Sequence, residues 1–147
     1  MKKNLSTIIF VTASLFFFCH PSPAFSAQDD HQHHKGPNAL IEEMTTLDKV
    51  FRDVVSAVAL SDNERVHKAL ASMHGTMEKT HEGVHAGSVV IPKNANRVKE
   101  FEKMDREFHE KLESLAEAAL SNNQTKMVRV TKQLLDGCVQ CHKVFRK

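Results

Sequence analysis

The sequence has few cysteines and almost no excess of positive charge, and each shortage excludes a class of protein. It contains three cysteines among 147 residues, Cys19 near the N-terminus and the pair Cys138 and Cys141. A structural zinc site takes four protein ligands, and no second cysteine pair is present to complete one. Lysine and arginine number 20 against 18 aspartates and glutamates. This balance argues against nucleic-acid binding, because neutralising a phosphate backbone requires a basic surplus.

The first 27 residues have the pattern of a secretory signal peptide. Two lysines form a basic start, residues 5–18 form an apolar run that is short for a bilayer span, and Ala24 and Ser26 supply small residues near a cleavage point. An uncleaved membrane anchor is the alternative. We expect residues 1–27 to be removed, which leaves 18 basic and 18 acidic residues, no membrane span and a protein located in the periplasm.

The next segment, residues 28–37, is polar and contains three histidines before a Gly-Pro pair. This composition is typical of a flexible leader. The histidines offer ligands to a divalent metal, but a short exposed histidine cluster is more often incidental. From residue 38 onward the pattern becomes that of long amphipathic helices, so we expect one domain over residues 38–147.

Four segments carry apolar residues at alternating spacings of three and four, which indicates helices with one buried face. These apolar stripes run over residues 40–58, 66–84, 98–115 and 127–145. The stretches Ser61-Asp62-Asn63-Glu64 and Ser121-Asn122-Asn123-Gln124 have the form of capping boxes, and Asn94 is the expected cap of the third helix. No strand pattern competes. Four helices with short connections predict an all-α, antiparallel up-down-up-down four-helix bundle.

The stretch Cys138-Val139-Gln140-Cys141-His142 is the c-type haem attachment pattern. Residues three apart lie on one face of a helix, so both thiols can add to the two vinyl groups of one porphyrin. His142 is then placed to bind the iron as proximal ligand. A thiol redox pair is an alternative, but it is expected near a helix start in a βαβ surrounding. The motif predicts one covalently attached haem c.

The segment 138–146 resembles the C-terminal part of the class II c-type cytochromes, the family of cytochrome c prime and its low-spin relatives. The similarity rests on the haem motif followed by Phe145 and Arg146, and extends upstream through Phe108 and Leu112 to the turn at 121–123. The resemblance implies a four-helix bundle with two thioether links and a proximal histidine. Relatives often form homodimers through their first two helices, and the resemblance extends that expectation to this chain.

In that family a residue of the first helix meets the other face of the haem, and it is apolar in the gas-binding proteins and Met in the low-spin ones. Aligning Phe51 with the family's aromatic residue places Met44 at this distal position. If Met44 binds iron opposite His142, the iron has no vacant position and the protein suits one-electron transfer. If Met44 only fills space, five-coordinate iron would bind nitric oxide or carbon monoxide.

A further alternative is a histidine-based metal-binding protein without haem. His67, His74 and His81 recur every seven residues, with His85 one turn further on, although a polar flank is the more common meaning of such a row. We expect His109 to be solvated.

We predict that this protein is a carrier and not an enzyme. Glu42, Glu43 and Asp48 lie off the apolar stripe of the first helix, so the expected distal face has no acid–base group. The expected partners are other periplasmic redox proteins.

Overall fold

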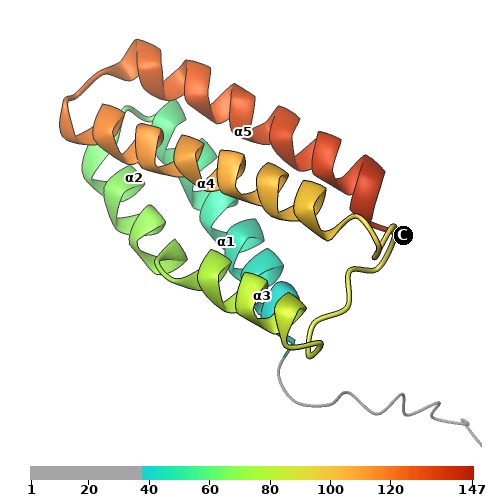
Figure 1. Ribbon diagram of the computed structural model, residues 1–147. Coiled ribbons are helices and arrows are strands. Elements are labelled where there is room, and N and C mark those ends of the chain that lie inside the picture. The colour runs from blue at the N-terminus through green and yellow to red at the C-terminus, as the bar shows by residue number, and fades with distance from the viewer. Residues whose placement is uncertain (1–37) are drawn as a thin grey trace, which may run out of the picture. The chain divides into compact units, whose positions relative to one another are not determined.

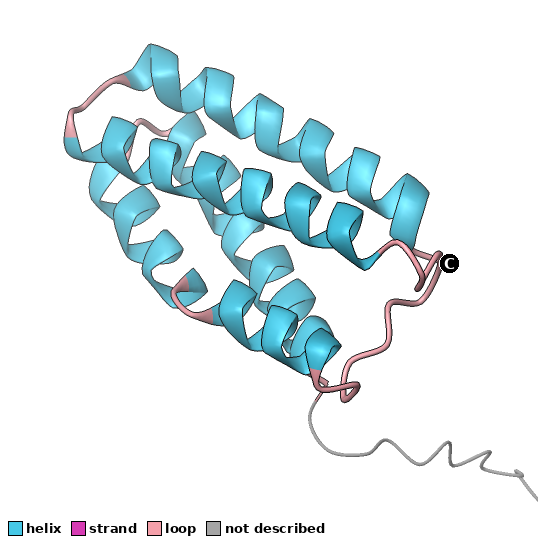
Figure 2. Ribbon diagram, in the orientation of Figure 1, coloured by secondary structure: helices cyan, strands magenta, loops and turns pink. Residues whose placement is uncertain are grey.

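The computed structural model describes residues 38–147, and the expected signal peptide and leader lie outside the described residues. Within the described part every regular element is helical, which confirms the predicted all-α class (Figure 2). The elements are α1 (Ala39–Ala59), α2 (Asn63–Leu70), the 3-10 turn η1 (Ala71–Met73), α3 (Thr76–His85), α4 (Val98–Leu120) and α5 (Gln124–Phe145). None of the described helices combines the length and the apolarity that a membrane span requires.

Asparagine and aspartate side chains begin three of these helices. Asn38 Oδ1 accepts from the backbone N–H of Leu40 at 3.1 Å, Asp62 caps α2 and Asn123 caps α5. The two capping boxes were therefore expected one or two residues too early. Ser61 and Asn122 instead adopt φ of 57° and 52°, left-handed conformations that turn the chain before the next helix begins.

The prediction of one continuous second helix is wrong, because the segment is divided into α2, η1 and α3. Gly75 precedes α3 with φ of 74°, a left-handed conformation that glycine adopts at little steric cost. Val66, Leu70 and Met73 are nevertheless all buried. The apolar stripe continues across the interruption, so its periodicity alone does not reveal the break.

The described helices enclose two clusters of buried apolar side chains. The larger cluster draws on α1, α2, η1, α4 and α5, and α4 lies alongside α5 over most of its length (Figure 1). The smaller one consists of Leu40, Val89, Ile91, Phe101 and Phe145. It therefore brings together the start of α1, the end of α5 and the connection between α3 and α4.

That connection is attached to the end of α5. Asn94 Nδ2 donates a hydrogen bond to the carbonyl oxygen of Val144 at 2.6 Å, and Asn94 has φ of 55°. The expectation that Asn94 caps the third helix is wrong, since α4 begins at Val98 without a side-chain cap. The asparagine instead fixes the link against the helix that carries the haem motif.

Candidate functional site

The two cysteines of the haem motif lie on the inner side of α5, as the stripe predicted. Both are half-buried and neither forms a disulfide. Cys138 packs against the larger apolar cluster, and Cys141 packs against the smaller one. The pair therefore spans the boundary between the two clusters, with both sulfur atoms on the core-facing side of one helix.

Burial makes both thiols weaker acids than a solvent-exposed cysteine. It raises the pKa of Cys138, and it raises the pKa of Cys141 to about 11, with further contributions from the charge of Asp105, from Cys138 and from the charge of Glu43. Thiol–disulfide chemistry and metal binding both use the thiolate, which such an environment disfavours. The setting argues against a redox-active thiol pair and against a thiolate zinc site.

The side chain of His142 is exposed, whereas the two cysteines are half-buried. Partial burial and the nearby positive charge of Arg146 lower the pKa of its imidazole. The ring is therefore neutral at pH 7, which is the form that binds a metal. Its position one residue after Cys141 places it next to the thiol pair.

Met44, the candidate distal ligand, is half-buried on α1 and packs against both apolar clusters. These are the clusters that Cys138 and Cys141 contact from α5. Met44 and the two cysteines therefore share one region of the core, although they are about 100 residues apart in the sequence.

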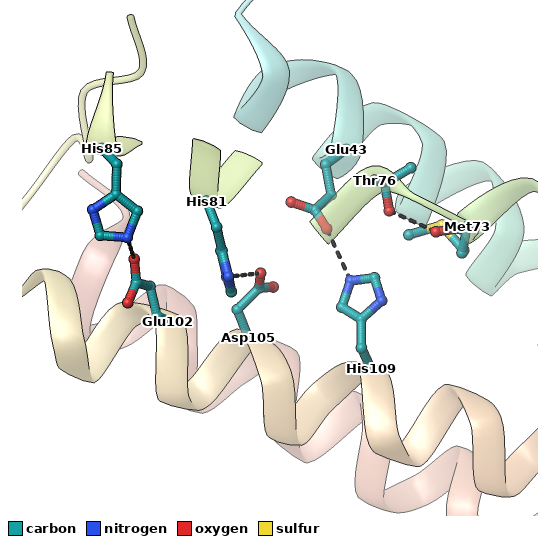
Figure 3. Close-up of polar contacts among 8 residues, drawn as sticks. All are labelled: Glu43, Met73, Thr76, His81, His85, Glu102, Asp105 and His109. Carbon is teal, nitrogen blue, oxygen red and sulfur yellow. Dashed lines mark hydrogen bonds and ion pairs between the residues drawn. The ribbon is translucent and has the colours of Figure 1, made fainter. Parts of the chain in front are cut away.

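A network of buried polar side chains lies close to Met44, and two of its members, Glu43 and His109, were expected to be exposed. Glu43 is only 1% exposed, and its Oε1 lies 2.8 Å from His109 Nε2 (Figure 3). The expectations that Glu43 lies off the buried face and that His109 is solvated are both wrong. Other helices pack against α1 from more than one side, so positions beside the apolar stripe are also buried.

Asp105 and His81 form a second pair beside the first. His81 Nε2 lies 2.9 Å from Asp105 Oδ2, and Asp105 is 7% exposed. Burial and then the charge of Glu43 raise the pKa of Asp105 to about 6, against the opposing effect of His109 and His81. For His109, burial opposes protonation, but the hydrogen bond to Glu43 and the charges of Asp105, Glu43 and Glu78 outweigh it and raise the pKa.

The row of histidines predicted on the second helix does not form one site. His67 and His74 are exposed, whereas His81 and His85 face α4. His85 Nε2 lies 2.7 Å from Glu102 Oε1, with the His85 side chain 69% exposed. The sequence did carry a signal for this pairing, because the carboxylates and His109 on α4 follow spacings of three and four residues.

Two hollows lie near these elements, and neither is at the haem motif. One is lined by residues of α1, α2 and η1. The other, of about 140 Å³, is lined by residues of α2, η1, α3 and α4 and by His74 between η1 and α3, and it includes Glu78 and His109. The second hollow therefore reaches the edge of the buried polar network.

No protein-family model, curated protein or solved structure shows a significant match to this chain. The function is therefore inferred from the residues and their geometry.

Proposed function

We propose that this protein is an exported, periplasmic monohaem c-type cytochrome of the class II type that carries single electrons. The observation that supports this is the motif Cys138–His142 in the last turns of α5. Its two thiols face the core, and its histidine is exposed and has a lowered pKa. Covalent haem attachment requires two free thiols on one helix face and an adjacent neutral imidazole that can bind the iron. Cys138, Cys141 and His142 meet this requirement.

The sides of α1 and α5 near the motif suit a porphyrin. On α5, Leu135, Cys138 and His142 share one side, and Leu135 is 53% exposed. On α1, Met44 is half-buried and packs against both apolar clusters. An exposed apolar side chain such as that of Leu135 is the kind of surface that a bound ring removes from water.

The two sides belong to neighbouring helices. Gln124, the first residue of α5, donates from Nε2 to the carbonyl oxygen of Val58 near the end of α1 at 2.7 Å. This contact supports an antiparallel up-down-up-down four-helix bundle in which α1, the α2–α3 segment, α4 and α5 are the four members. In that arrangement α1 supplies the distal side of the haem and α5 the proximal side.

The residues then have separate roles. Cys138 and Cys141 would hold a porphyrin through thioether bonds, and His142 would bind its iron. Met44 from α1 would supply a second iron ligand, a soft thioether of the kind that cytochromes pair with histidine. A bound haem would supply a one-electron couple, and the protein would contribute ligands that change little on reduction.

A second candidate function follows from the packing of Met44. Its contacts with both apolar clusters are also what a space-filling methionine makes. In that case the distal side is only apolar, and the protein is a five-coordinate binder of nitric oxide or carbon monoxide. A haem-free metal-binding protein is the third candidate, and it would be colourless.

Expression of the full chain together with haem-maturation machinery tests the proposal. The denatured product should carry the mass of one haem, and Cys138→Ala should weaken its retention. The oxidised spectrum should be low-spin, with a sulfur-to-iron band in the near infrared.

Met44→Ala should convert the iron to a high-spin form that binds carbon monoxide. Met104→Ala is the matched control, since Met104 also packs half-buried against the smaller cluster but lies on α4. A product whose haem is extracted by acid acetone contradicts covalent attachment. A wild-type spectrum that is already high-spin favours the gas-binding alternative.

A further inference from the structure

Four ionisable side chains from three helices converge in the interior, beside the expected haem region. Glu43 comes from α1, His81 from α3, and Asp105 and His109 from α4 (Figure 3). One ligand atom each from Glu43, Asp105 and His109 lies within 4.8 Å of the others. His81 Nε2 is 2.9 Å from Asp105 Oδ2, which adds a second imidazole to the group.

The cluster is incompletely satisfied by its own hydrogen bonds. Glu43 Oε2 is buried and has no hydrogen-bond partner among the described residues, although Glu43 Oε1 is bound to His109. Figure 3 shows this second oxygen directed toward the side on which His81 and Asp105 lie. A buried carboxylate oxygen without a partner is costly, so a cation or another donor at this position would stabilise the cluster.

We propose that Glu43, His81, Asp105 and His109 bind one divalent transition-metal cation. Two carboxylates and two imidazoles make a mixed oxygen and nitrogen donor set, which suits zinc, iron or nickel better than magnesium or calcium. Ligand atoms of a tetrahedral zinc site lie about 3.3 Å apart. The ligand atoms of Glu43, Asp105 and His109, all within 4.8 Å of one another, are close to this spacing. His81 would complete the set from its position beside Asp105.

The charge balance supports the same site. Two carboxylates held together in the core repel each other, and a dication would compensate both. The pKa of Asp105 is raised mainly by burial and, to a smaller extent, by the charge of Glu43. The hollow of about 140 Å³ that includes Glu78 and His109 in its lining offers an access route from solvent.

None of the four residues belongs to the candidate haem motif, so zinc binding and haem attachment can be measured separately. Binding is measured with Zn²⁺ on the full chain, purified either with or without covalent haem, by equilibrium dialysis followed by elemental analysis. We expect one tightly held Zn²⁺ per chain. X-ray absorption at the zinc edge should show imidazole nitrogen and carboxylate oxygen donors and no sulfur.

Glu43→Gln and His109→Asn should each weaken Zn²⁺ binding by more than about a hundredfold, because even supporting groups around a metal contribute 10–100-fold. His85→Asn is the matched control: it removes a neighbouring histidine–carboxylate pair outside the cluster and should leave binding unchanged. Circular dichroism verifies that each variant is folded. Zn²⁺ should also raise the unfolding temperature of the wild type and not of Glu43→Gln.

Three results would overturn the proposal. The first is the absence of stoichiometric Zn²⁺ in the wild type. The second is a sulfur signal, which would assign the ion to Cys138 and Cys141. The third is loss of binding when His31, His33 and His34 are replaced together while Glu43→Gln still binds. Covalent haem in a protein that binds no zinc would refute this site alone. Zinc binding by a product that stays haem-free despite the haem-maturation machinery would refute only the cytochrome.

Discussion

Gly83 lies directly against the side chain of Val89: a Cβ at this glycine would be 2.6 Å from Val89 Cγ2. The backbone N–H groups of Ser88 and Val89 both donate to the Gly83 carbonyl oxygen at 2.9 Å. Val89 is itself 5% exposed and belongs to the smaller apolar cluster. The close approach therefore sets the path by which the chain leaves α3 toward α4.

Gly83→Ala should destabilise the protein, although alanine normally favours a helix. The added methyl group collides with a buried side chain that has little room to move, and we expect a net loss of about 1–2 kcal/mol in the free energy of unfolding. Urea unfolding measures it. In a Val89→Ala background the same change should cost much less, and equal costs in both backgrounds would show that the two residues do not interact.

The stability of the metal-free protein should depend on pH through Asp105 and His109. The pKa of Asp105 is raised to about 6 from an ordinary 3.8, so the folded state holds this proton more strongly than the unfolded state. The stabilisation of the folded state by this proton on Asp105 is complete below about pH 4 and is lost as the pH rises through about 6. His109 acts in the same direction, because its raised pKa stabilises the fold below its ordinary value of 6.5 and this is lost as the pH rises through the folded value.

Comparison with Asp105→Asn cancels the titrating groups that do not interact with Asp105 and leaves the effect of Asp105 together with its influence on His109. The stability difference, wild type minus variant, should fall by on the order of 2 kcal/mol between about pH 4 and about pH 8. Unfolding by urea at several pH values, with a chelator present, provides the measurement. A difference that stays constant over this interval would contradict the argument.

The thiols should react slowly in the folded, haem-free chain. A pKa of about 11 for Cys141, compared with an ordinary 9.0, lowers the thiolate population at neutral pH. Alkylation by iodoacetamide should therefore be more than about tenfold slower in the folded protein than in urea, because the thiolate is the nucleophile. Mass spectrometry follows the rates. Faster alkylation in the folded state would favour the redox-pair alternative.

The purified haem protein should show no appreciable peroxidase turnover. Glu43 and His109 place acid–base groups in the core, but each is bound to the other at 2.8 Å, and a ligated Met44 leaves no iron position for peroxide. Oxidation of a chromogenic donor by hydrogen peroxide is the assay. Substantial turnover that is lost in Glu43→Gln but kept in Glu42→Gln, its exposed neighbour, would make the protein an enzyme.

The helices were predictable because their signals are local and periodic. Apolar spacings located all four helical segments, and the candidate haem motif was proposed from only five consecutive residues. The inward direction of Cys138 and Cys141 also followed from their register on the stripe of α5. These features depend on residues within a few turns of one another, which a single sequence displays directly.

The meeting of Glu43 and His109 in the interior was decided by tertiary structure. Glu43 and His109 are separated by 66 residues, and whether they meet depends on how α1 and α4 are rotated and how closely they pack. Neither lies on the apolar stripe of its helix, so local pattern assigned both to solvent. The amino-acid sequence by itself determined the helices and the candidate haem motif. Packing decided which charged side chains became buried partners, because burial is a property of the assembled helices and of no single one.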